Sequence, residues 1–365
     1  MKTFKKFALT VITLVFILSI IVLLISAFSD RISPLRNVYI SFFGLFFPFI
    51  LGFNILFLII WAIFKKWKYV AISFLVLIIC SGSIRAYFPI NFPNKEIPQN
   101  SIKVLTYNVM RFEHLRKHST KEPNPILEYV KEQDPDIVCF QEFAFSEQDN
   151  FLTKKDIIKA IDMPYHSILF PKQHSSNGLA IFSKYPILSA RLLPISSEYN
   201  GAGVYDLDIN GKKVTLVNNH LESNKLSGED RTTYYNMTTK DINSQKLEAF
   251  THLMFRRLRP AFKKRARQAI AVREYLDKTE NEYIIVCGDF NDTPVSYAKH
   301  KIKGNLKDAF VESGSGMGIT FNRNRFYFRI DNILYSKNMK AYNCSVGTLK
   351  NSDHYPIVTH LEFSE

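Results

Sequence analysis

Short polar motifs stand beside apolar runs at six places in the chain. They supply carboxylates, amides and imidazoles next to segments that could form buried strands. The motifs are Tyr107-Asn108, Gln141-Glu142, Asn218-Asn219-His220-Leu221, Gly288-Asp289-Phe290-Asn291, Arg329-Ile330-Asp331 and Ser352-Asp353-His354. If several strand ends bring these groups together, the groups could bind a hard metal ion and cleave a phosphate ester. The sequence therefore predicts an enzyme.

Glu142 is the first candidate metal ligand. It follows an apolar run over 137–140, so its carboxylate would emerge at the end of a buried strand. An ionised carboxylate there is costly unless a cation neutralises it. The other candidates are also carboxylates and amides, the oxygen ligands that suit Mg²⁺ or Mn²⁺ rather than zinc. The alternative for Glu142 is an ordinary surface acid.

Two histidines are candidates for proton transfer or phosphate binding. The imidazole of His354 titrates near neutrality, and its role depends on a partner for the second ring nitrogen. His220 lies beyond a strand-like run and could donate a hydrogen bond to a phosphate oxygen as charge builds. For His220 the alternative is a buried histidine at a strand end.

Taken in order with Ser183-Lys184-Tyr185-Pro186, the motifs resemble the endonuclease/exonuclease/phosphatase superfamily. That group includes pancreatic deoxyribonuclease, abasic-site endonucleases, inositol-phosphate phosphatases and bacterial sphingomyelinases. The resemblance runs from about Lys103 to about Leu361, and any one motif alone would be weak. It implies a four-layer α/β sandwich: two packed mixed sheets, helices on both outer faces, and the active site at one end.

By this resemblance Glu142 is the principal metal ligand, and Asn108 and Asp353 lie close to the metal or its waters. One departure bears on the metal site. Met110 lies two residues after Asn108, where several nuclease relatives carry an acidic residue. Methionine is a poor ligand for Mg²⁺. A second metal position and abasic-site chemistry are therefore disfavoured, and the Asn-x-His-Leu pattern favours the branch with sphingomyelinase-like phosphodiesterases as well as nucleases.

The resemblance also implies the catalytic roles. Asp331 would hold the second ring nitrogen of His354, which acts as an acid, a base or a phosphate-polarising group. Asp289 would transfer a proton or activate the nucleophile. Asn291 and His220 would donate hydrogen bonds to the phosphate.

Apolar periodicity predicts the elements that position these residues. The predicted strands cover 102–107, 137–140, 178–182, 204–209, 213–218, 283–287, 327–335 and 357–361, and the predicted helices lie near 125–133 and 260–278. Asn210-Gly211 between two of these strands is typical of a tight hairpin turn. Mixed hairpins and helices in this order indicate an α/β sandwich.

The N-terminal part predicts a membrane segment. No charged residue occurs from Phe7 to Ser29 or from Asn37 to Phe64, and each run exceeds the roughly 20 residues that span a bilayer. A third uncharged run, from Tyr69 to Ile84, is shorter. We expect a transmembrane region over 1–88 with helices at about 7–28, 38–64 and 69–85, a linker over 89–101, and a catalytic domain over 102–365. The alternative for the first run is a cleaved signal peptide.

Loop charges predict the orientation. Three lysines precede the first predicted helix, and Lys65, Lys66 and Lys68 follow the second, whereas the first loop has only Arg31 and Arg36. The positive-inside rule then places the N-terminus in the cytoplasm and, after three crossings, the catalytic domain on the extracytoplasmic side. If the third run only lies on the membrane, this orientation inverts.

Part of the net charge of +14 belongs to the predicted transmembrane region over 1–88. A second basic cluster has seven lysines and arginines between Arg256 and Arg267 and no acids. It would attract the phosphates of anionic lipid or of nucleic acid, unless it is simply a solvated helix face.

We therefore predict an integral membrane protein with Mg²⁺-dependent phosphodiesterase activity on nucleic acid or on a phospholipid headgroup. Its expected partners are the lipid bilayer and the phosphoester substrate, and no protein partner is inferred. The alternative is a catalytically silent membrane-anchored binding module of the same fold. Only Met110 favours that alternative.

Overall fold

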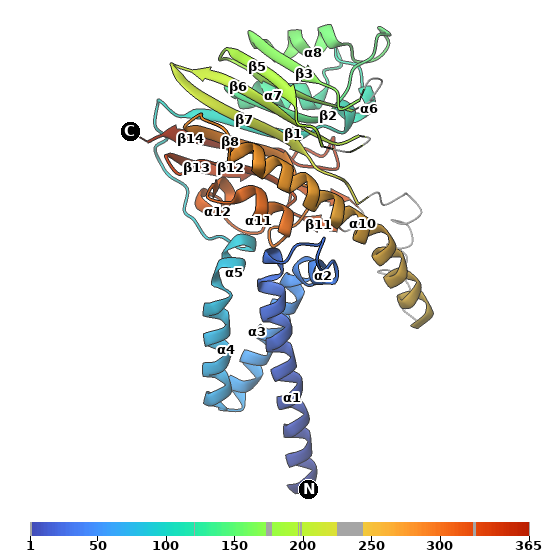
Figure 1. The fold of residues 1–365 in the computed structure, drawn as a ribbon, viewed down its shortest axis with the longest axis vertical. Coiled ribbons are helices and arrows are strands. Elements are labelled where there is room, and N and C mark those ends of the chain that lie inside the picture. The colour runs from blue at the N-terminus through green and yellow to red at the C-terminus, as the bar shows by residue number, and fades with distance from the viewer. Residues whose placement is uncertain are drawn as a thin grey trace.

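The computed structural model describes residues 2–119, 121–172, 177–195, 197, 199–224, 244–323 and 326–364, so 225–243 of the predicted catalytic domain lie outside the described residues. Two mixed sheets of six strands pack face to face (Figure 1). The first contains, in spatial order, β13 (Met339–Val346), β14 (Ile357–Phe363), β1 (Ile102–Asn108), β2 (Ile137–Phe143), β4 (Gly178–Ser183) and β3 (Tyr165–Leu169). The second contains β5 (Ile187–Leu192), β6 (Gly201–Ile209), β7 (Lys212–His220), β8 (Tyr283–Asp289), β12 (Asp331–Tyr335) and β9 (Lys307–Asp308). A short hairpin joins β10 (Phe321–Arg323) and β11 (Phe326–Phe328).

Helices cover the outer face of each sheet. α7 (Pro125–Gln133) and α8 (Lys154–Ile161) pack on the first sheet, whereas α10 (Ser244–Leu276) and α11 (Tyr297–Lys303) pack on the second. Between the sheets, alternate strand residues such as Val104 of β1 and Leu216 of β7 form one buried apolar cluster. This arrangement confirms the predicted sandwich of two mixed sheets flanked by helices.

Five α-helices form the N-terminal part, namely α1 (Lys2–Ala27), α2 (Tyr39–Leu45), α3 (Phe47–Ile63), α4 (Trp67–Ile79) and α5 (Ser81–Tyr87). The stretch Lys6–Ala27 of α1 is long and apolar enough to cross a membrane. The other two predicted spans are broken, with bends of 64° between α2 and α3 and 65° between α4 and α5. The prediction of three continuous helices is therefore corrected to one candidate span, or up to three if each bent pair counts as one.

Local sequence explains both breaks. Pro48 lies at the start of α3, where its missing N–H and its ring exclude a regular helix through the preceding turn. The α4–α5 break falls at Cys80, directly before Ser81 and Gly82, and such small residues are common at helix kinks. Each break thus follows from residues that weaken the helical hydrogen-bond ladder.

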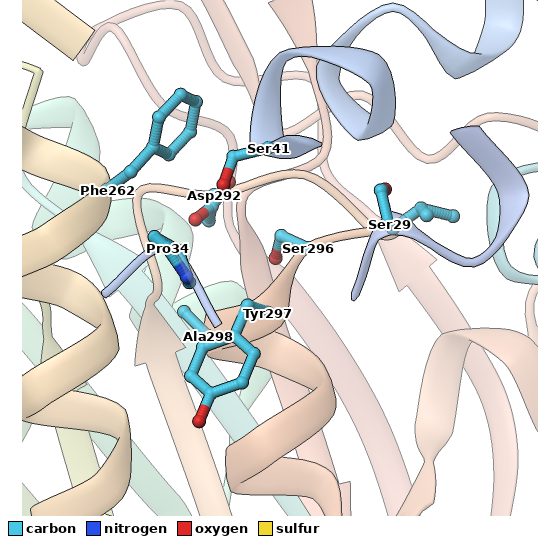
Figure 2. A pocket seen from close by; sticks show the side chains of 9 residues that line it. Ser29, Pro34, Ser41, Phe262, Asp292, Ser296, Tyr297 and Ala298 are labelled. Carbon is cyan, nitrogen blue, oxygen red and sulfur yellow. The ribbon is translucent and has the colours of Figure 1, made fainter. Parts of the chain in front are cut away.

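The N-terminal helices pack against the sandwich. A side chain at Gly44 of α2 would lie 2.4 Å from the hydroxyl of Ser29 and 2.5 Å from the carbonyl oxygen of Val295, so only glycine fits this approach. Arg85 of α5 pairs with Glu312 at 3.2 Å. Figure 2 shows a small pocket at this junction, lined by Ser29, Pro34, Ser41, Phe262, Asp292, Val295, Ser296, Tyr297 and Ala298. Residues 88–101, between α5 and β1, form no helix or strand.

Three local predictions had different outcomes. The hairpin turn at Asn210-Gly211 is confirmed, since Ile209 pairs with Lys212 and both turn residues have positive φ. The single strand predicted over 327–335 is wrong, because the chain leaves β11 at Phe328 and re-enters pairing only at Asp331 in β12. The helix predicted near 260–278 begins earlier, at Ser244, and continues through Pro260.

Candidate active site

Strand pairing aligns three of the predicted catalytic residues. In the second sheet, Asp289 of β8 lies opposite His220 of the parallel strand β7 and opposite Asp331 of the antiparallel strand β12. β7 and β8 end at this edge, while β12 begins there. The register itself therefore places His220, Asp289 and Asp331 side by side.

Gly288 makes this pairing possible. Its φ is +112°, and a Cβ there would lie 2.1 Å from the carbonyl oxygen of Asn219. Any larger residue would push β8 away from β7 and separate Asp289 from His220. Gly288 is thus required for the close approach of two backbones.

The first sheet contributes Asn108 and Glu142. The ends of β1 and β2 lie side by side, because Asn108 pairs with Gln141 in parallel register. The pairing of β2 with β4 shifts between Phe140 and Phe143, and Glu142 has a φ of +49°. Such a bulge redirects a side chain out of the regular alternation. It brings Glu142 to the active-site edge.

The carboxamide of Asn108 joins the two sheets. Its Nδ2 donates to Oε1 of Glu142 at 3.3 Å and to Oδ2 of Asp289 at 3.2 Å. Nε2 of His220 lies 3.8 Å from Oε1 of Glu142 and 3.7 Å from Oδ2 of Asp289. Burial raises the pKa of Glu142, although the positive charge of His354 opposes this change. A positive charge beside Glu142 would stabilise its ionised form.

His354 and Asp331 form a buried hydrogen-bonded pair. Nδ1 of His354 lies 2.8 Å from Oδ2 of Asp331, and its Nε2 lies 3.7 Å from Oδ2 of Asp289. Burial by itself would lower the pKa of His354, but the two carboxylates outweigh it and raise the pKa to about 10. This shift favours the protonated ring at neutral pH. The three residues also offer ligand atoms within 4.8 Å of one another, which is close enough for a metal ion.

Asp289 is the centre of the hydrogen-bond network. The backbone N–H of Asn291 donates to Oδ1 of Asp289 at 2.8 Å, and the Asn291 carboxamide donates to Oδ2 at 3.0 Å. Burial raises the pKa of Asp289 to about 6, although the nearby His354 opposes this. Burial also lowers the pKa of His220, which keeps that ring neutral at pH 7. A carboxylate that titrates close to neutrality is suited to general base catalysis.

Asp353 forms an ion pair with an arginine, Arg323, that the sequence analysis did not single out. Its Oδ2 lies 3.1 Å from Nη1 of Arg323, which comes from the β10–β11 hairpin and also lies 3.8 Å from the sulfur of Met110. In the sequence, Arg323 is simply a charged residue outside any of the motifs. The β10–β11 hairpin is what brings it beside Asp353. The adjacent Ser352 donates to the carbonyl oxygen of Asn108 at 2.7 Å and thereby holds the C-terminal motif against β1.

Arg265 of α10 was also missed as a site component. Its side chain is 1% exposed, and its Nε donates to Oδ2 of Asp292 at 3.0 Å. Its Nη1 donates to the carbonyl oxygen of Glu222 at 2.9 Å and to Oδ1 of Asn224 at 2.8 Å. Asp292 directly follows Asn291, and Glu222 lies two residues after His220. Arg265 therefore ties together the two loops that carry these site residues.

Direct side-chain contacts bring together seven of the eight predicted site residues: Asn108, Glu142, His220, Asp289, Asn291, Asp331 and His354. The eighth, Asp353, lies next to His354 in the chain and contacts Arg323 instead. Carboxylate and amide oxygens are the donors that a hard divalent cation requires. With a protonated imidazole and a carboxylate base beside them, these groups could support hydrolysis of a phosphate ester.

Comparisons with known proteins agree with this chemistry. The profile of a family described as the endonuclease/exonuclease/phosphatase family matches residues 105–354. A second profile, described only as a domain of unknown function, matches residues 7–87. A search of curated protein sequences found no match.

Several solved structures are similar to this chain at low sequence identity. ANGEL2, described as a 2',3'-cyclic phosphatase in complex with adenosine-2',3'-vanadate, has 15% identity and a TM-score of 0.51, with 76% of this chain and all of that chain covered. Truncated TDP2 from Caenorhabditis elegans has 18% identity and a TM-score of 0.46, covering 74% of this chain and 100% of that one. The human nocturnin catalytic domain has 18% identity and a TM-score of 0.48, covering 73% and 96%.

Proposed function

We propose that this chain, which belongs to the endonuclease/exonuclease/phosphatase family of metal-dependent phosphoric ester hydrolases, is a membrane-anchored Mg²⁺-dependent phosphodiesterase. One observation carries the proposal. Two carboxylates from different sheets, Glu142 and Asp289, meet across the carboxamide of Asn108 beside the His354–Asp331 pair. A cluster with this composition, in which only Glu142 is partly exposed, is costly unless it binds a cation and a polar substrate.

The residues around Glu142 fit a divalent cation better than the cluster of Asp289, Asp331 and His354 does. In that cluster Nδ1 of His354 is already engaged by Asp331, and imidazole nitrogen suits a hard cation such as Mg²⁺ less well than carboxylate oxygen does. Glu142 offers a carboxylate whose pKa is raised by burial and which a cation would neutralise. We therefore assign the metal to Glu142, with Asn108 and Asp353 near it. The bound ion would supply positive charge that neutralises charge on the phosphoryl group.

The protein residues divide the proton transfers between them. Asp289, held by two hydrogen bonds from Asn291, accepts a proton from the water that attacks phosphorus. As the bond to the leaving oxygen breaks, the protonated ring of His354 can give that oxygen a proton. Asp331 fixes the orientation of the ring through Nδ1. His220, neutral because of burial, donates to a non-bridging phosphate oxygen.

Membrane anchoring rests on the N-terminal helices. In addition to the apolar stretch of α1, large apolar side chains on α3 and α4 are exposed, among them Phe49 (70%), Ile63 (70%) and Ile78 (67%). Exposed apolar surface of this extent is typical of contact with lipid. If each bent pair crosses once, the lysine asymmetry places the N-terminus in the cytoplasm and the catalytic domain on the extracytoplasmic side.

The test uses the full chain in detergent micelles. We expect hydrolysis of bis-p-nitrophenyl phosphate with Mg²⁺, loss of turnover in EDTA, and recovery when Mg²⁺ is restored. An oligonucleotide and sphingomyelin vesicles then distinguish the two substrate classes, and p-nitrophenyl phosphate tests for monoesterase activity. Activity on monoesters alone, or turnover that EDTA does not change, would contradict the proposal. A folded protein that is inactive on every ester would instead favour the binding module.

A further inference from the structure

Four basic residues line one face of α10. Arg256, Arg259, Lys263 and Arg267 recur at intervals of three, four and four, which places them on one side of a helix. Three of them are exposed, and Lys263 is half-buried. We call this set the α10 basic stripe. Within the described part of the chain, no carboxylate forms an ion pair with any of the four.

The opposite face of the same helix is occupied. Leu258 and Phe262 are buried in a cluster with Val38 and Phe42 of the α2 region. Arg265 is buried against Asp292. The basic segment over 256–267 is therefore divided between a buried and an exposed environment. Arg265 holds the loops of the active site, whereas the α10 basic stripe is available to a partner.

The α10 basic stripe lies beside the apolar N-terminal helices. Figure 1 shows that α10 continues beyond the second sheet and passes next to α2. The guanidinium of Arg259 lies 5.2 Å from the ring centroid of Tyr39, which is 53% exposed on α2. In the preceding loop, Ile32 and Leu35 are 39% and 41% exposed. Cations, an aromatic ring and exposed aliphatic side chains together are typical of the headgroup zone of a bilayer.

We infer that the α10 basic stripe binds the phosphates of anionic phospholipids in the bilayer that holds the N-terminal helices. The inference rests on the membrane anchoring proposed above. A phosphate-bearing surface complements the charge of the α10 basic stripe, and lipid would also cover Ile32 and Leu35. A nucleic acid in the same place would leave these side chains in water.

Lipid binding at this face would also orient the active site. Arg265 of α10 binds Asp292 and Glu222. Asp292 is in the same loop as Asn291, and Glu222 is in the loop that follows His220. The helix that would rest on the headgroups is thus attached directly to the active-site loops. This arrangement would keep the catalytic end at a constant height above the bilayer, where phosphoesters of the membrane surface are concentrated.

The experiment places the full chain in nanodiscs of phosphatidylcholine, with or without phosphatidylglycerol, and follows amide hydrogen exchange over 253–267. We expect exchange in phosphatidylglycerol discs to slow by roughly tenfold at low salt, because each basic residue gains energy near an anionic surface. High salt should reverse the effect. The triple variant Arg256→Gln, Arg259→Gln, Arg267→Gln should lose it. A control variant, Lys213→Gln, Lys278→Gln, Lys337→Gln, removes the same charge from exposed positions elsewhere and should keep it.

Equal exchange in both kinds of disc, or an effect retained by the triple variant, would overturn the inference. Slowing that only an added oligonucleotide produces would overturn it in favour of nucleic-acid binding. Turnover of bis-p-nitrophenyl phosphate in the same discs separates this inference from the proposed function. Turnover without a lipid effect rejects the lipid site alone, whereas a lipid effect without turnover supports the lipid site and rejects the phosphodiesterase.

Discussion

Arg265 and Asp292 form a buried ion pair, with the guanidinium Nε 3.0 Å from Oδ2 of the carboxylate. The same guanidinium binds two acceptors in the loop after His220. Lysine could keep the charge but could not reach all three acceptors, since it lacks the planar fork of arginine. Arg265→Lys should therefore displace the active-site loops without leaving Asp292 unpaired.

For Arg265→Lys we expect kcat to fall by roughly ten- to hundredfold with a smaller change in KM, because misplacement of catalytic groups mainly affects the transition state. The matched control is Arg267→Lys, two residues along and exposed, which should leave kcat unchanged. An Arg265→Lys enzyme with unaltered kcat would show that the pair serves stability alone.

Glu142→Gln should abolish most activity while leaving the fold intact, because it removes the charge that holds the cation but preserves shape. Added Mg²⁺ should raise the Tm of the wild-type protein more than that of the variant, since a ligand stabilises only the state that binds it. Glu147→Gln, an exposed acid nearby, serves as the control and should behave as wild type. Equal thermal shifts in Glu142→Gln and wild type would rule out Glu142 as the principal ligand.

His354→Ala should lower kcat by on the order of 10² to 10⁴, because it removes the acid. Asp331→Asn should cause a smaller loss, since it disturbs only the tautomer and orientation of the ring. The double variant should be little worse than His354→Ala alone, because groups that act as a unit are not additive. Single and double variants compared by kcat provide the measurement, and fully multiplicative losses would mean that the two residues act independently.

The His354–Asp331 pair also predicts a pH dependence of stability. Burial opposes protonation of His354, but Asp331 and Asp289 raise its pKa from 6.5 to about 10 in the folded protein. A raised pKa contributes stability that is fully present below the ordinary value and is lost as the pH rises through the folded value. The Tm difference between wild type and Asp331→Asn should therefore be largest near about pH 6 and shrink toward about pH 10. A difference that grows with pH would contradict the assigned protonation state.

A reporter enzyme that is active only outside the cytoplasm should work when fused after Glu365 and fail when fused after Lys68. The reason is the lysine asymmetry between the ends of the first two predicted spans. Neutral residues in place of Lys65, Lys66 and Lys68 should weaken or scramble this orientation. A reporter after Glu365 that works only in the cytoplasm would show that the α4–α5 pair does not cross.

The residues of the candidate active site could be picked out from the sequence because they lie at the ends of regular strands. A strand has a side-chain period of two and ends at a polar motif, so Asn108, Glu142 and Asp289 were recognisable from local pattern. The hairpin turn at Asn210-Gly211 was equally local, since positive φ at two positions demands such residues.

Contacts between distant segments depended on tertiary structure. Gln141 donates to Oδ1 of Asn218 at 2.7 Å and so links the two sheets, although 77 residues separate them. Asp353 contacts Arg323, which lies on β10, a hairpin strand that no predicted element covered. Nothing local distinguishes such partners, because the energy of each contact depends on how the two sheets pack.

The sequence by itself determined which residues could do chemistry and which segments are apolar enough for a membrane. Tertiary structure decided which charged residues of the 256–267 segment are buried and which are exposed. Helical periodicity separates buried Arg265 from exposed Arg259, but only the packing of α10 between α2 and the second sheet shows which face is covered. The physical reason is that charge is a property of the residue, whereas burial is a property of its neighbours.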